Sequence, residues 1–234
     1  AFPPPHSMYK LALFMELIIR RKSAVPPPGD YEIRRLFRLP LLLFPFLLSS
    51  CLHGPGQSRA PLPPGYVYRG NYIDVTSPRS EGWYLVNSSA AGMEFARKGV
   101  LPGETFGAQV LMFPLAPARD EKEFVELVRK GFAADIDPER FSVVESDFRF
   151  TAERGYPCVK VRYTAQDRKA QVSPSARGTL LLQAESLYCR HTVRQDTGFS
   201  IIYSHRGKEA YPNLATEAAY FFDGVQVPAA GRTQ

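Results

Sequence analysis

An apolar segment that ends at a cysteine constrains this chain more than any other feature. From position 34 to Cys51 the sequence reads RRLFRLPLLLFPFLLSSC, with basic residues first, an apolar run next and two serines before the cysteine. A positive stretch, an apolar core of roughly 7–15 residues and small residues at a cleavage site are typical of a secretory signal. The apolar run is well short of the roughly 20 residues that a membrane-spanning helix needs. We therefore predict that residues 34–50 are a signal peptide and exclude residues 1–50 from the fold.

The residues Leu48-Ser49-Ser50-Cys51 resemble the lipobox of bacterial lipoproteins. The resemblance implies cleavage before Cys51, a lipid on its sulfur and a protein held on a membrane by lipid chains. In that class an Asp after the cysteine is associated with retention in the inner membrane, so Leu52 favours the outer membrane. An ordinary signal peptide with an incidental Cys51 is the alternative. The run from Arg34 to Phe37 also partly resembles a twin-arginine signal, which leaves the export route open.

The sequence divides into five parts. Residues 1–33 are an N-terminal extension of unassigned role, and 34–50 are the signal. Residues 51–70, rich in Gly and Pro, read as the lipidated cysteine and a tether, 71–228 as one domain and 229–234 as a loose tail.

The net charge of the chain falls when the signal is removed. Seven of the 29 Lys and Arg residues and three of the 23 Asp and Glu residues precede Cys51, which lowers the net charge from +6 to about +2. A strongly basic surface is the usual mark of nucleic-acid binding, so we predict no nucleic-acid partner.

Two cysteines remain after Cys51. Cys158 and Cys189 each lie in an apparent strand, YPCVKVRY and LYCRHTV. In an oxidising periplasm a pair of cysteines favours a disulfide, and adjacent strands would bring the two together. Two buried thiols or a reactive cysteine remain the alternatives.

Strand patterns dominate the predicted domain. Alternating or β-branched and aromatic residues predict strands at 72–76, 82–86, 92–97, 106–115, 141–153, 158–165, 178–193 and 198–206. One helix is expected to begin after Asp120, with Glu123 as its capping partner. A second is expected to begin near Asn213 and to end at Gly224, with a buried stripe of Leu214, Ala218, Phe221 and Val225. This order predicts an α+β fold, in which an antiparallel β-sheet carries two helices packed on it.

That element order is similar to the Mog1/PsbP-like fold. The stretch from GWY through CVKVRY, YCRH and IIYSHR also resembles a group of proteobacterial lipoproteins, and this resemblance implies no activity. Fold does not specify function in any case.

Polar side chains with chemical potential gather in YCRH and YSHR. His191, Ser204, His205 and Arg206 form the predicted polar cluster. A cysteine nucleophile paired with a histidine is conceivable there, but Cys189 is expected in the disulfide. His191 and His205 with Glu185 or Asp196 lack a characteristic ligand spacing, so we predict no metal, no cofactor and no catalytic residue.

The sequence thus predicts a lipid-anchored envelope protein that faces the periplasm and is not an enzyme. Its partners would be the membrane, through the lipid on Cys51, and an envelope protein that its domain binds or helps to assemble. A small-ligand or lipid-binding module is the first alternative. A hydrolase using His191 and His205 is the second.

Overall fold

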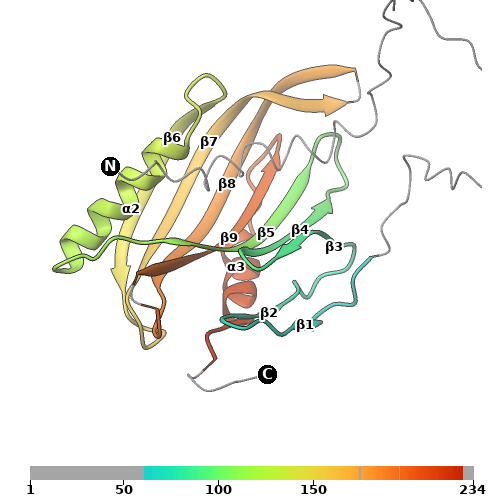
Figure 1. Ribbon diagram of the computed structural model, residues 1–234. Coiled ribbons are helices and arrows are strands. Elements are labelled where there is room, and N and C mark those ends of the chain that lie inside the picture. Colours follow the sequence, from blue (N-terminus) through green and yellow to red (C-terminus); the bar gives the residue numbers. More distant parts are fainter. Residues whose placement is uncertain (1–60, 174, 195, 229–234) are drawn as a thin grey trace, which may run out of the picture.

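The computed structural model describes residues 61–173, 175–194 and 196–228 (Figure 1). The predicted signal, Cys51 and the predicted tail lie outside these residues. Neither of the described helices is long and apolar enough to cross a membrane.

A seven-stranded antiparallel sheet forms the centre of the domain. Its strand order is β3-β4-β5-β9-β8-β7-β6. The strands are β3 (Tyr84–Ser89), β4 (Gly92–Lys98), β5 (Thr105–Pro114), β6 (Phe141–Thr151), β7 (Cys158–Ser173), β8 (Ala176–Arg190) and β9 (Thr197–Gly207). Each corresponds to a predicted strand, and β7 runs well beyond its predicted end.

A second, smaller antiparallel sheet has the order β1-β2-β10. Its strands are β1 (Val67–Tyr68), β2 (Asp74–Thr76) and β10 (Val225–Gln226). The structure thus places Val67 and Tyr68, which fall in the segment predicted as a tether, in a strand. Val225, predicted for the buried stripe of the last helix, is buried instead in β10, where it pairs with Val75 of β2. Two-residue strands have too little periodicity to be recognised from sequence.

The two helices are α2 (Glu121–Asp135) and α3 (Leu214–Asp223). The Oδ1 atom of Asp120 accepts the Glu123 backbone N–H at 2.8 Å, which confirms the predicted cap. The Glu123 carboxylate in turn accepts the backbone N–H of Arg119 at 2.6 Å, so the start of α2 is fixed on both sides.

The helices cover opposite faces of the large sheet. Successive residues of β9 alternate between the faces: Ile201 belongs to the core that packs against Phe221 of α3, and Ile202 to the core that packs against Phe124 of α2. The predicted α+β fold, with two helices on one antiparallel sheet, is therefore confirmed, and the sheet lies between them.

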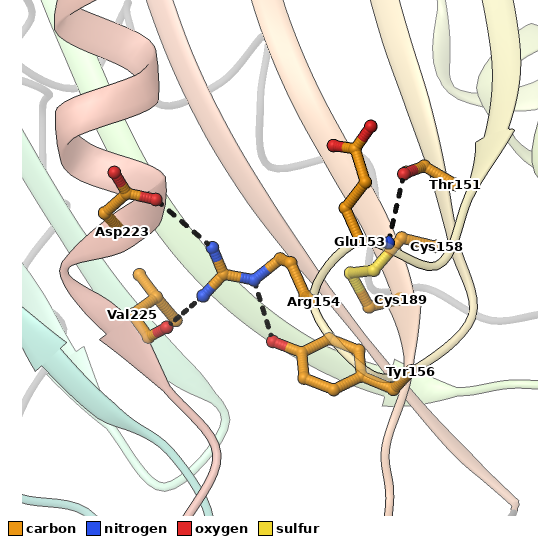
Figure 2. Close-up of a disulfide and its surroundings, with 8 residues drawn as sticks. All are labelled: Thr151, Glu153, Arg154, Tyr156, Cys158, Cys189, Asp223 and Val225. Carbon is orange, nitrogen blue, oxygen red and sulfur yellow. Dashed lines mark hydrogen bonds and ion pairs between the residues drawn. A yellow bond between two sulfur atoms is a disulfide. The ribbon is translucent and has the colours of Figure 1, made fainter.

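The two cysteines form a disulfide, as predicted. Cys158 of β7 lies directly opposite Cys189 of β8, and both are fully buried on the α3 face. Figure 2 shows Arg154, from the turn before β7, reaching across to donate to the Val225 carbonyl at 2.5 Å and to the Tyr156 hydroxyl at 2.9 Å. A buried disulfide is typical of proteins that fold outside the cytoplasm.

Candidate functional site

A groove lies between the small sheet and the turn that joins β3 to β4. Its volume is about 580 Å³, within the range of ligand-binding clefts. Val75 and Val110 are buried at its floor, and half-buried Met93 and Met112 flank them. We refer to this site as the tyrosine groove, because Tyr66, Tyr68 and Tyr72 line it.

Tyr66 and Tyr68 support one another at one side of the tyrosine groove. Their ring centroids are 4.8 Å apart in an edge-on contact, and Tyr68 also contacts the core ring of Phe95 at 5.7 Å. The backbone N–H of Tyr66 donates to Ser77 Oγ at 2.9 Å, which fixes the chain before β1. Burial and then the nearby Tyr66 raise the pKa of Tyr68, so its hydroxyl keeps its proton at neutral pH.

His191 contacts both the backbone carbonyl and the ring of Tyr72. The Nδ1 atom of His191 accepts the backbone N–H groups of Val193 at 3.1 Å and Arg194 at 3.2 Å. We infer that the proton is on Nε2, which lies 3.4 Å from the Tyr72 carbonyl and donates to it. The two rings also meet edge-on at 6.1 Å. His191, a predicted site residue, therefore positions a wall of the tyrosine groove.

The loop that carries Tyr72 is further fixed by Asp74. The Oδ1 atom of this 9 % exposed carboxylate accepts the Gly70 N–H at 3.2 Å. The guanidinium of Arg194, an exposed residue, lies 5.0 Å from the Tyr72 ring centroid. The loop from Arg69 to Tyr72, which forms the rim of the groove, therefore has its backbone fixed by hydrogen bonds although the tyrosine side chains are exposed to solvent.

His205 belongs to a different site, on the α3 face of β9. Its Nε2 lies 3.1 Å from Glu104 Oε1, and the ring packs against Phe106 and Tyr211. Burial lowers the pKa of His205 despite Glu104, so the imidazole is neutral near pH 7.

Glu217 of α3 ties the helix to the sheet beside His205. Its carboxylate accepts the hydroxyl of Tyr203 and, at 2.6 Å, that of Tyr211. Arg97 lies 3.4 Å from the same carboxylate and 4.0 Å from the centre of the Phe106 ring. Because the acidic and basic groups here pair with one another, the arrangement serves first to anchor α3.

Ser204 and Arg206 lie on the opposite face of the sheet from His205. They alternate with His205 along β9, so their side chains lie on the α2 face. Ser204 Oγ donates to the Gly107 carbonyl at 3.4 Å, and Arg206 pairs with the fully buried Asp167 at 3.2 Å. Arg140 binds the same carboxylate through two hydrogen bonds of 3.0 and 2.9 Å.

The predicted polar cluster is therefore wrong as a single site. The backbone N–H of His191 donates to the carbonyl of Thr197, the first residue of β9, whereas His205 lies near the end of that strand. At about 3.3 Å per residue the two histidines are roughly 25 Å apart along the strand. They cannot act on one reacting group. Among the described residues, no three His, Cys, Asp or Glu side chains are placed to hold a metal ion.

Sequence reasoning missed the tyrosine groove. Tyr66 and Tyr68 fall in the segment predicted as a tether, and the cleft forms only when β1 pairs with β2. The signal that could have revealed it is the run GYVYRGNYID, from Gly65 to Asp74, which contains three tyrosines.

The sequence matches no family model and no curated protein. Solved structures with distant similarity include a protein from Bacteroides thetaiotaomicron, at 9 % identity and a TM-score of 0.38 over 72 % of this chain. This chain spans half the length of that protein. LpqN, involved in cell envelope biogenesis of Mycobacterium tuberculosis, is similar at 12 % identity and a TM-score of 0.41 over 74 % of this chain and 87 % of LpqN. The Saccharomyces cerevisiae Ran-binding protein Mog1p is similar at 12 % identity and a TM-score of 0.38, over 72 % of this chain and 94 % of Mog1p. Likenesses this distant carry no information about activity or partner.

Proposed function

We propose that this chain is a lipid-anchored protein of the bacterial cell envelope that binds a protein partner through the tyrosine groove. The lipid is on Cys51, the domain faces the periplasm, and the outer membrane is favoured by Leu52. The domain acts by binding and not by catalysis, and it uses no cofactor. The lipobox-like residues and the disulfide between Cys158 and Cys189 support this location.

The observation that carries the proposal is the character of the groove walls. Tyr66 is 52 % exposed and Tyr72 is 42 % exposed, above a floor of buried valines. Tyrosine and methionine are enriched at protein interfaces, where a tyrosine offers a large apolar ring and a hydroxyl with little loss of side-chain entropy. Because the loop beneath Tyr72 is fixed by His191 and Asp74, little ordering is needed when a partner binds.

The groove also lies within reach of the membrane. Tyr66 is the fifteenth residue after Cys51, and at full extension this stretch spans at most about 50 Å. A partner bound there would be held near the lipid surface. This suits a protein that recruits or assembles other envelope components.

Site-specific photocrosslinking in cells tests the proposal. A benzoylphenylalanine at Asn71, an exposed groove residue, should capture a defined envelope protein, and Tyr72→Ala should remove that product. The matched control is the same probe at Val144 of β6, which is 64 % exposed and far from the groove in the sheet order. The captured protein, once purified, should bind the wild type more tightly than the Tyr72→Ala variant. Identical products from both probes, or none at Asn71, would count against the proposal.

The apolar floor supports a second candidate, a small-ligand or lipid-binding module. Val75, Val110 and the two methionines could receive an acyl chain or another apolar ligand. Native mass spectrometry of protein purified without detergent distinguishes the candidates. A retained ligand that Met93→Gln displaces would favour the module, and a consistently empty domain would weigh against it.

A further inference from the structure

We propose that the tyrosine groove selects an acidic, extended segment of its partner, with carboxylates bound by Arg69 and Arg194 and apolar side chains on the floor. This inference rests on the proposed function and adds the chemistry of the ligand. It comes from the charges at the rim, which the binding proposal does not use.

Among the described residues that line the groove, none is acidic and the one charge is positive. Arg69 carries that charge. Arg69 and Tyr72 lie in the same loop, and Arg194 lies over the Tyr72 ring at 5.0 Å. A guanidinium pairs with a carboxylate through two parallel hydrogen bonds, so the arginine that lines the groove and the arginine over the Tyr72 ring can each bind a carboxylate.

Neither arginine is neutralised by a carboxylate in the described part of the chain. This sets them apart from several other arginines of the domain, since Arg97, Arg140 and Arg162 each pair with a Glu or Asp. The positive potential at the rim is therefore available to a ligand.

Two acidic residues that are next in sequence to residues of the groove do not line it. The Asp74 carboxylate is buried and accepts the Gly70 N–H. Glu94 follows Met93 in β4, so its side chain lies on the opposite face of the sheet from the groove.

The remaining rim groups fit a peptide better than a lipid. Asn71 and Ser88 line the groove and carry an amide and a hydroxyl group, whereas the hydroxyl of Ser89 already bonds to Ala91 and Gly92 in its own turn. A peptide backbone offers an N–H and a C=O at each residue to such groups, whereas an acyl chain offers neither. These features match an acidic peptide segment. The apolar floor can receive its side chains, the neutral polar groups can bond its backbone, and the arginines can bind its carboxylates.

A bead-displayed library of random decapeptides without cysteine tests the inference. The probe is the purified full chain carrying Cys51→Ala, which removes the lipid site. Selected peptides should be enriched in Asp or Glu next to Leu, Ile or Phe. Arg69→Ala with Arg194→Ala should weaken binding of a selected peptide at least tenfold, whereas Arg177→Ala, an exposed arginine of β8, should leave it unchanged.

Charge reversal supplies a gain of function that misfolding cannot imitate. Arg69→Glu with Arg194→Glu should reverse the selection toward Lys and Arg next to the same apolar residues. Enrichment of basic or uncharged peptides by the wild type, no enrichment, or unchanged selection by the reversed variant would each overturn the inference. The photocrosslink at Asn71 separates the two proposals: a partner still captured by the reversed variant would leave the binding function standing and remove the charge requirement.

Discussion

The disulfide between Cys158 and Cys189 should contribute about 3.7 kcal/mol to the free energy of unfolding. The two cysteines are 31 residues apart, and the chain-entropy model assigns that amount to a closed loop of this length. For a domain of this size, each kcal/mol moves the melting temperature by about 2–4 °C. Loss of the disulfide should therefore lower Tm by roughly 7–15 °C.

Urea denaturation measures this contribution directly. Three samples are compared: oxidised wild type, wild type equilibrated with a reductant, and the double variant Cys158→Ala with Cys189→Ala. The reduced wild type keeps both sulfur atoms in the core, so it separates loss of the crosslink from loss of packing. Both samples without the crosslink should be less stable than oxidised wild type by about 3–4 kcal/mol and should agree within about 1 kcal/mol.

Two results would refute this reasoning. A loss below about 1 kcal/mol in both samples would show that the hairpin of β7 and β8 already confines the unfolded chain. A large loss in the double variant alone would show that the two sulfur atoms stabilise the core by packing and not by closing the loop.

Three further predictions address the anchor, the α3 contact and pH. Cys51→Ala should abolish palmitate labelling and release the protein from membranes; labelling that persists would contradict the lipobox assignment. Glu217→Gln should destabilise the domain by about 1–3 kcal/mol, because the carboxylate that receives two tyrosine hydroxyls and Arg97 is lost. Burial raises the pKa of Asp135 to about 7, so the native state keeps a proton that the unfolded chain releases near pH 4, and the stability from this group is lost as pH rises through 7. Asp135→Asn should therefore stabilise the domain more at pH 8 than at pH 5, by about 1 kcal/mol since the side chain is only half-buried. Glu121→Gln, exposed in the first turn of α2, is the control for both stability measurements and should change stability by less than about 0.5 kcal/mol.

The elements that sequence predicted well depend on short-range rules. The cap at Asp120 is a contact between residues three apart, and strand alternation is visible within one segment. The disulfide was also predictable, because Cys158 and Cys189 each lie in a strand pattern and the predicted lipid on Cys51 would leave them as an even pair.

The parts that sequence reasoning missed depend on contacts between distant segments. Val225 continued the helical stripe of α3 and yet pairs with Val75 in a separate sheet. His191 and His205 both follow strand patterns, but which face and which end of the sheet each occupies depends on pairing. Nearness along the chain therefore suggests that the two histidines form one group, and the fold separates them.

Local patterns in the amino-acid order are enough to predict an export segment, to predict the helices and strands, and to predict the pairing of Cys158 with Cys189. Tertiary packing decides that α2 and α3 lie on opposite faces of the sheet and that His191 contacts Tyr72. It also forms the groove that Val75 and Val110 line. The physical reason is the distance along the chain over which each interaction acts. Capping and alternation act over a few residues, whereas the groove needs the pairing of β1 with β2 and the turn between β3 and β4, which no single stretch of sequence contains.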